Sequence, residues 1–210
     1  KIHWVKALFL QGGATLIFTF WEQAFRIFER SLGSIMQIGV ITSLTQAQQL
    51  VGAVMYLLAQ PISLIVHPTL ARSYALNDLK TFELHFLRAL RLAIYTYLPI
   101  SFVFSVVISR ITHLFLQQGE FTVSAANVTG LAAQVLAFGI AFQGLYMLLM
   151  RTMLALKGSK GLARIGFYGW TFAMILDVFM ASKFQIAGLA ATTVIAFAVL
   201  DVVMLLSIRN

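Results

Sequence analysis

Six long apolar runs follow one another along the chain, separated by short polar loops. They lie near residues 7–28, 38–66, 89–109, 128–150, 165–182 and 187–207. Each run is long enough to cross the hydrocarbon core of a bilayer, which takes about 20 helical residues. The pattern therefore predicts an all-α integral membrane protein, in which residues 1–210 form a single bundle of six transmembrane helices.

Basic residues gather in alternate loops between these runs. Six crossings put both ends of the chain on one side of the membrane, and that side holds eleven of the 15 Lys and Arg residues. Because Lys and Arg concentrate in cytoplasmic loops, both ends are predicted to be cytoplasmic. The eleven are Lys1, Lys6, Arg72, Lys80, Arg88, Arg91, Arg151, Lys157, Lys160, Arg164 and Arg209; the other side has Arg30, Arg110 and Lys183, and Arg26 lies inside a run.

The longest cytoplasmic stretch runs from His67 to Arg91. Its apolar residues, among them Leu70, Phe82 and Phe86, recur at roughly helical spacing between charged neighbours. Such a pattern is typical of an amphipathic helix that lies at the membrane surface. We therefore expect a cytoplasmic interfacial helix that leads into the third span.

Composition narrows the class of protein. With 60% hydrophobic and 10% charged residues, the chain has too little polar surface for a water-soluble domain. The net charge of +8 lies in loops between spans, where membrane lipid head groups are the natural partners, so no nucleic-acid partner is expected. The chain has no cysteine, and its four histidines show no metal-ligand spacing. We therefore expect a transporter, channel or scaffold rather than an enzyme, and a fragment of a larger protein, since the chain begins with Lys1.

A polar stripe follows one face of the first predicted helix, where ionisable groups are costly in a membrane. Glu22 and Arg26 have the i,i+4 spacing of an ion pair, and Arg26 and Glu29 have the i,i+3 spacing. The pairs either neutralise each other or line a hydrated path through the bundle. The stripe consists of Gln11, Thr15, Thr19, Glu22, Arg26 and Glu29.

The second predicted helix carries a similar stripe of amides and hydroxyls, which includes Gln49 and Gln60. It serves either as hydrogen-bonding contact between helices or as part of the path.

Asp177 and Asp201 lie in the fifth and sixth runs. A carboxylate in hydrocarbon must be protonated, paired or bound to a cation.

An all-oxygen pocket is one way to satisfy these carboxylates. Glu29, Asp177 and Thr193 come from the first, fifth and sixth runs, and their oxygens suit a small hard cation or a protonation site. No Lys or Arg lies within four residues of Asp177, so a local ion pair cannot serve. We expect a monovalent cation, sodium, at these three residues, and no other cofactor.

Several short motifs together resemble the C-terminal lobe of the MurJ (MviN) lipid II flippases, members of the multidrug/oligosaccharidyl-lipid/polysaccharide exporter superfamily. Their order and spacing along nearly the whole chain carry the resemblance. The motifs are Glu29-Arg-Ser-Leu-Gly-Ser34, residues 39–47, Pro68-Thr-Leu-Ala-Arg72, Leu90-Arg-Leu92 with Pro99, Leu114-Phe115, Gly119-Glu-Phe-Thr122, residues 151–166 and Gly188-Leu-Ala190.

The resemblance implies one lobe of a two-lobe flippase of the bacterial cytoplasmic membrane, whose N-terminal lobe is missing from this sequence. The implied substrate is lipid II, an undecaprenyl-pyrophosphate-linked peptidoglycan precursor, moved by alternating access. Arg26 and Arg30 are then candidates for pyrophosphate contact, and Glu22, Gln49 and Gln60 for lining the path. The implied cation ligands are Glu29, Asp177 and Thr193.

Two departures from the family pattern bear on this interpretation. Gln48-Gln49 stands where the family places a basic residue after an acidic one, which favours a flippase for another lipid-linked glycan, such as an O-antigen or exopolysaccharide unit. Asp177 and Asp201 stand where relatives often carry Asn. A third hypothesis is a non-transporting scaffold derived from a transporter, although a charged seam without a role would only cost stability.

Overall fold

The computed structural model is helical throughout the residues it describes, which are 2–36, 39–116, 123–156 and 158–209. Side chains are described over 12–36, 39–58, 60–114, 125–156 and 158–209. The side chains of Lys1, Lys6, Gln11 and Lys157 and the Gly119 motif therefore lie outside the described residues. The helices are α1 (Ile2–Ile35), α2 (Val40–Ala75), α3 (Leu79–Leu116), α4 (Val123–Phe138), α5 (Ile140–Ala155) and α6 (Ser159–Arg209).

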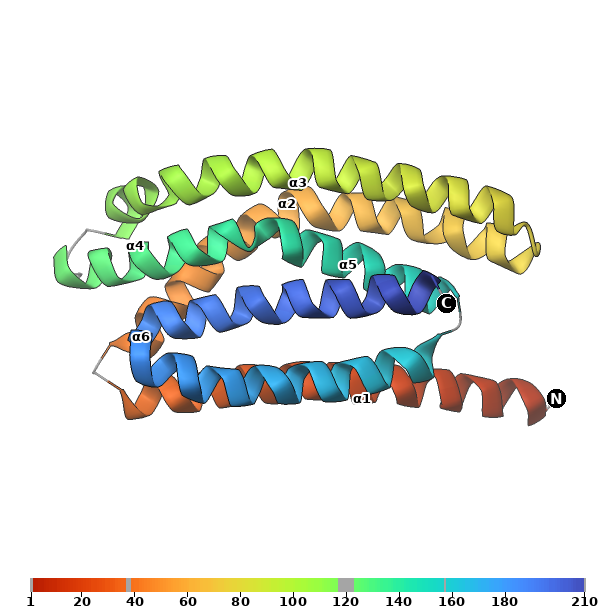
Figure 1. The fold of residues 1–210 in the computed structure, drawn as a ribbon, viewed down its shortest axis with the longest axis horizontal. Helices are drawn as coiled ribbons and strands as arrows, with labels where there is room; N and C mark the ends of the chain where they lie inside the picture. The colour runs from red at the N-terminus through yellow and green to blue at the C-terminus, as the bar shows by residue number, and fades with distance from the viewer. Residues whose placement is uncertain (1, 37–38, 117–122, 157, 210) are drawn as a thin grey trace.

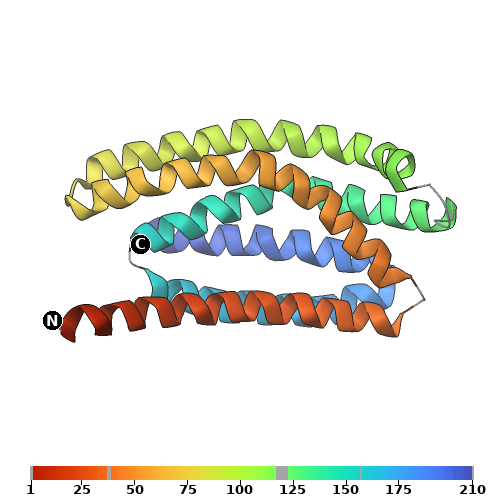
Figure 2. The ribbon, with the colours of Figure 1, turned by 180° about the vertical axis from the view of Figure 1, so that it is seen from behind.

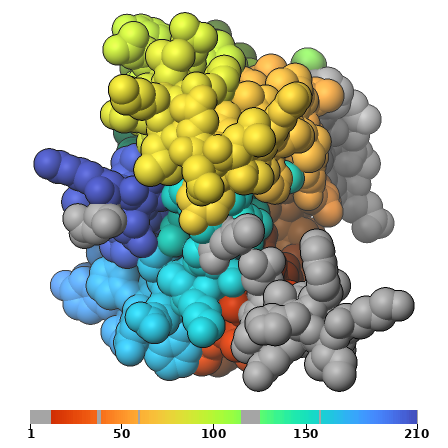
Figure 3. Space-filling view, turned by 90° about the vertical axis from the view of Figure 1, so that its right-hand side faces the viewer, coloured from red at the N-terminus to blue at the C-terminus, as the bar shows by residue number. Residues whose placement is uncertain are grey.

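The helices run along the long axis of one elongated bundle (Figures 1 and 2). α1 packs along the first half of α6, while α3 packs on α4 at the opposite side of the bundle. Both chain ends lie at the same end of the bundle as the α2–α3 turn and the start of α6 (Figure 1). Figure 3 looks at this end of the molecule.

The chain reverses direction inside α6, which consists of two antiparallel helices. The reversal occurs at Gln185, whose backbone has φ 51° and ψ −130°. A Cβ atom at Gly188 would overlap the carbonyl of Met180, so the close approach after the reversal requires glycine. The halves before and after Gln185 correspond to the fifth and sixth apolar runs.

The fourth apolar run also contains a break. α4 and α5 meet at 47° around Gly139. In α2, the segments Val40–Leu58 and Gln60–Ala75 meet at 44° beside Pro61, where a proline removes a backbone hydrogen bond. Among the described residues, Leu79–Leu114 and Ser159–Arg209 are long and apolar enough to cross a membrane, and counting each bent pair as one span gives up to four such elements.

The expected interfacial helix does not form as a separate element. α2 continues through His67 to Ala75, and α3 begins at Leu79. Leu70, Phe82 and Phe86 are buried within one hydrophobic cluster of the bundle. Leu70 lies on α2 and Phe82 and Phe86 lie on α3, so the predicted helix is divided between two elements. These apolar side chains pack on protein instead of on lipid, and the same amphipathic pattern serves either surface.

A tight turn joins α2 to α3 in the middle of that stretch. Asn77 adopts a left-handed conformation with φ 56°, which asparagine tolerates better than most residues. The Asp78 carboxylate accepts a hydrogen bond from the backbone N–H of Thr81 at 3.0 Å, as an N-cap residue does. Hydrogen bonds from Thr81 hold the pKa of Asp78 below its usual value.

Candidate functional site

The polar face of α1 opens into a cavity of about 720 Å³ within the bundle. Its wall combines charged and amide side chains with aromatic and aliphatic ones, as ligand sites commonly do. Because α1, α2, α4, α5 and the second half of α6 all contribute, the cavity depends on the packing of the whole chain. The polar lining residues are Glu22, Gln23, Arg26, Glu29, Arg30, Thr45, Gln48, Gln49, Tyr56, Gln143 and Thr193.

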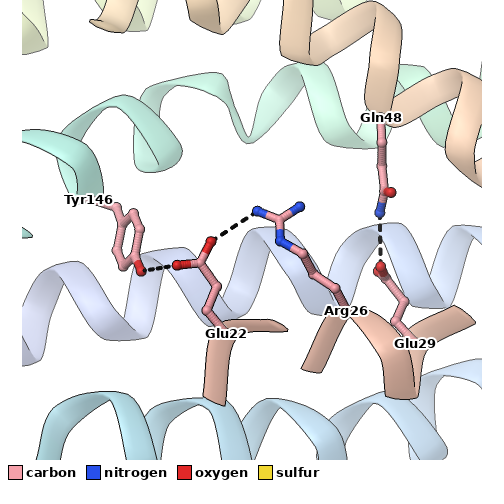
Figure 4. Close-up of polar contacts among 5 residues, drawn as sticks. All are labelled: Glu22, Arg26, Glu29, Gln48 and Tyr146. Carbon is pink, nitrogen blue, oxygen red and sulfur yellow. Dashed lines mark hydrogen bonds and ion pairs between the residues drawn. The ribbon is translucent and has the colours of Figure 1, made fainter. Parts of the chain in front are cut away.

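Glu22 and Arg26 form the ion pair that their spacing predicts. Arg26 Nη2 lies 3.0 Å from Glu22 Oε1, and the second oxygen of Glu22 accepts a hydrogen bond from the Tyr146 hydroxyl at 3.1 Å. Figure 4 shows this chain of contacts from α5 to α1. The side chain of Arg26 is 40% exposed, so its charge is presented to the cavity while Glu22 is held from both sides.

Glu29 has other partners than Arg26. One carboxylate oxygen accepts a hydrogen bond from Gln48 Nε2 and the other from Thr193 Oγ1, each at 2.8 Å. Only 2% of Glu29 is exposed. These contacts join α1, α2 and the second half of α6 (Figure 4 shows the Gln48 contact). Gln48 therefore has a definite role as a donor to a buried carboxylate.

Asp177 lies near this cluster but outside the cavity wall. It is fully buried, and neither carboxylate oxygen has a hydrogen-bond partner among the described residues. It interacts electrostatically with Glu29. The Thr192 hydroxyl donates to the Gly188 carbonyl at 3.0 Å and also interacts with Asp177. Glu29 and Asp177 are thus buried and Thr193 is half-buried. The two Asp177 oxygens lack a donor among the described residues.

Of the other residues predicted to line the path, two line the cavity and one does not. Arg30 and Gln49 line the same cavity as Arg26. Gln60 does not line it, and lies beyond the bend of α2, where its backbone carbonyl accepts a hydrogen bond from Ser63. The bend carries the end of the α2 stripe away from the cavity, which regular helical spacing does not foresee.

Sequence reasoning missed Tyr146 and Gln143, which α5 brings to the site. In the sequence, α5 is an ordinary apolar segment. In the structure, Tyr146 is 4% exposed within an aromatic cluster. Its ring lies 4.9 Å from that of Phe197 and 6.1 Å from that of Phe18, measured between centroids. A buried tyrosine hydroxyl requires a partner, and that requirement is the one signal in the sequence that pointed to Tyr146.

The family comparison decides where the chain belongs. The family model described as "Lipid II flippase MurJ" matches residues 2–210. The chain belongs to the MurJ lipid II flippase family. By its description, this family consists of membrane transporters of lipid II.

Solved structures agree with the family in fold. The chain is similar to "Lipid II flippase MurJ, inward closed conformation", with a TM-score of 0.85, 22% identity, and 93% of this chain and 41% of that chain covered. A transporter of the MOP superfamily from Pyrococcus furiosus matches with a TM-score of 0.83 and 14% identity, over 95% of this chain and 43% of that one. An outward-facing multidrug resistance MATE family transporter of the same superfamily matches equally, with 44% of its chain covered.

The chain therefore spans less than half the length of these structures. No curated protein matches the chain.

Proposed function

We propose that this chain is one six-helix lobe of a flippase that moves lipid II, the undecaprenyl-pyrophosphate-linked peptidoglycan precursor, across the bacterial cytoplasmic membrane. The observation that carries the proposal is the cavity in which Arg26 and Arg30 stand beside amide side chains, in a chain of the MurJ family. The second lobe of the transporter is the partner that completes the cavity.

The physical problem for such a protein is the head group of its substrate. Moving two phosphates and sugars through hydrocarbon without partners costs many kcal/mol. The planar guanidinium of Arg26 has five N–H donors, and its contact with Glu22 uses one of them. Arg26 and Arg30 contact the pyrophosphate, Glu22 positions Arg26, and Gln49 offers its amide to the sugar, while the lipid tail remains in the bilayer.

The geometry supports an arrangement of six crossings with both ends in the cytoplasm. α1, α2, α3, the α4–α5 pair and the two halves of α6 supply the crossings. The α2–α3 turn, which Arg72 and Lys80 flank, lies at the same end of the bundle as both termini. Transport then proceeds by alternating access, in which this lobe rocks against its partner.

Glu29, Asp177 and Thr193 hold a monovalent cation in this scheme, with sodium as the candidate. The ion supplies positive charge that balances buried carboxylates. Since these residues join three helices, its binding tightens the packing of α1 against α6.

Substitution of Arg26 tests the proposed function. In the full-length protein, Arg26→Ala should abolish growth of a strain depleted of its own lipid II flippase, and Arg26→Lys should restore only part of it, because lysine lacks the planar fork. Arg209→Ala is the matched control, since it removes the same charge from an exposed position at the end of α6. Normal growth with Arg26→Ala, at equal protein level, would contradict the proposal.

A second candidate is a flippase for another lipid-linked glycan. Gln49 favours it, because an amide lines the cavity where the resemblance leads one to expect a basic residue. Under this alternative the full-length protein fails to support growth of the lipid II flippase-depleted strain, and instead restores O-antigen or exopolysaccharide export in strains that lack those flippases.

A further inference from the structure

A second buried carboxylate, Asp201, lies apart from the Glu29 cluster. It is 4% exposed, and neither of its oxygens has a hydrogen-bond partner among the described residues. It sits eight residues after Thr193 on the second half of α6, and its neighbour Leu200 lies so close to the first half that a Cβ atom at Gly169 would overlap the Leu200 side chain. Asp201 thus lies inside the protein and does not face lipid.

The surroundings of Asp201 are aromatic. Phe197, one helical turn earlier, packs on Trp170 at 5.6 Å and on Tyr146 at 4.9 Å between ring centroids. Phe25 stacks on Trp170 at 5.1 Å. A carboxylate among such groups needs a bound proton or a cation, since desolvation of an isolated charge is costly.

The ionisable groups nearby offer no cation of their own. Tyr146 on α5 interacts electrostatically with Asp201, and beyond it Glu22 and Arg26 on α1 form their ion pair. On the first half of α6, Asp177 faces Glu29 and Tyr168 is 70% exposed. Lys160, Arg164 and Arg209 are exposed, Arg151 lies near His67, and α4 contains no titratable residue.

We propose that Asp201 is a proton-binding site whose proton exchanges with the cavity through Tyr146 and Glu22. Tyr146 is the intermediate because its hydroxyl donates to Glu22 at 3.1 Å, while its ring packs on Phe197, one helical turn before Asp201. Tyr146 also interacts electrostatically with Asp201. When Tyr146 gives its hydroxyl proton to Glu22 and takes the proton of Asp201, two O–H bonds break and two form. The net result is one proton moved from Asp201 to Glu22: Asp201 becomes ionised, Glu22 becomes neutral and Tyr146 is unchanged.

The transfer has a consequence for Arg26. Protonation of Glu22 removes the charge that holds the guanidinium at 3.0 Å, so Arg26 is released toward an anionic ligand in the cavity. Occupation of the cavity by an anion and movement of a proton off Asp201 are therefore linked, and linkage acts in both directions. The site is separate from the cation ligands and does not depend on which lipid is carried.

Infrared spectroscopy of the purified full-length protein tests the site without any substrate. At neutral pH the wild type should show the carbonyl stretch of a protonated carboxyl group that Asp201→Asn lacks and that Asp177→Asn retains. Asp201→Glu, which keeps a titratable group, should move this band rather than remove it. If the band is the same in wild type and Asp201→Asn, Asp201 carries no proton and the proposal is wrong.

Exchange into D₂O tests the route. The shift of the Asp201 band should slow by at least about tenfold in Tyr146→Phe, since one positioned proton-transfer group is lost. Tyr95→Phe is the matched control, because Tyr95 is 78% exposed on α3. Equal exchange rates in the two variants would exclude Tyr146 as the route, whereas a slow rate in Tyr146→Phe alone would support it.

Discussion

Glu29 on α1 is held by single side chains from two other helices. Each of its oxygens accepts one hydrogen bond, from Gln48 on α2 and from Thr193 on α6. Hydrogen bonds to charged groups are stronger than those between neutral groups. Only 2% of Glu29 is exposed, so each donor has a direct effect on stability.

Removal of one donor should be costly. Thr193→Val should lower the free energy of unfolding by about 1–3 kcal/mol, because a buried carboxylate oxygen loses its partner. Thr152→Val is the control, since Thr152 is also buried and its hydroxyl donates to the backbone carbonyl of Leu148. Unfolding titrations in mixed detergent micelles measure both variants, and equal losses would argue against a special role for the Glu29 contact.

Asp177 has two oxygens without donors, and the proposed cation gives them a partner. Sodium that binds only the folded state should increase the free energy of unfolding by about 2.7 kcal/mol when its concentration is about 100 times Kd. The melting temperature should rise accordingly. The response should exceed that to an equal concentration of a bulky organic cation. Asp177→Asn should lose most of the sodium response and Asp201→Asn should keep it; equal responses in wild type and Asp177→Asn would leave Asp177 without a sodium role.

At the scale of elements, the break between α4 and α5 is fixed by its neighbours. The Ser101 hydroxyl of α3 contacts the carbonyl oxygens of Ala137 and Phe138, which are among the groups left unpaired where a helix ends. A Cβ atom at Gly139 would lie 2.6 Å from Val194 Cγ2. Glycine therefore allows the second half of α6 to pack against the bend, beside the cavity that Gly139 helps to line.

Two glycine substitutions separate packing from helix propensity. Gly139→Ala should destabilise the protein by about 1–3 kcal/mol, because the added methyl overlaps Val194 in a packed core. Gly52→Ala, where the new Cβ atom meets nothing within 4 Å, should stabilise it by about 0.5–1 kcal/mol, the preference of a helix interior for alanine. The double variant Gly139→Ala with Val194→Ala should recover part of the loss; no recovery would place the cause elsewhere.

At the scale of the whole molecule, the bundle has two distinct ends. Both termini, the α2–α3 turn and the start of α6 share one end, and the end of α1 lies at the other (Figure 1). Many large apolar side chains of α3 are exposed, such as Phe102 at 67%, as expected for a surface that contacts lipid. The outer face of α3 therefore suits contact with lipid.

The absence of cysteine makes this arrangement easy to test. Single cysteines at Ser34 and Lys80, which are exposed at opposite ends of the bundle, should react differently with an impermeant thiol reagent in intact cells. Ser34→Cys should label from outside, and Lys80→Cys only after the membrane is opened. The reverse pattern would invert the proposed orientation.

The sequence by itself determined the helical class, the membrane as solvent, the Glu22–Arg26 pair and the likeness to the family. These features depend on composition, on order along the chain, or on residues one helical turn apart, and helical geometry fixes such spacing locally. The apolar runs also anticipated both halves of α6, because each half has its own run of hydrophobic residues.

Only the tertiary structure decided which helices meet and at what rotation. It brought Gln48 to Glu29 and Tyr146 to Glu22, over 19 and 124 residues of chain, and the bend in α2 carried Gln60 away from the cavity. It also buried the face of residues 67–91 that was expected at the membrane surface. An amphipathic pattern states that a face must be covered, but the offset and rotation between helices determine what covers it.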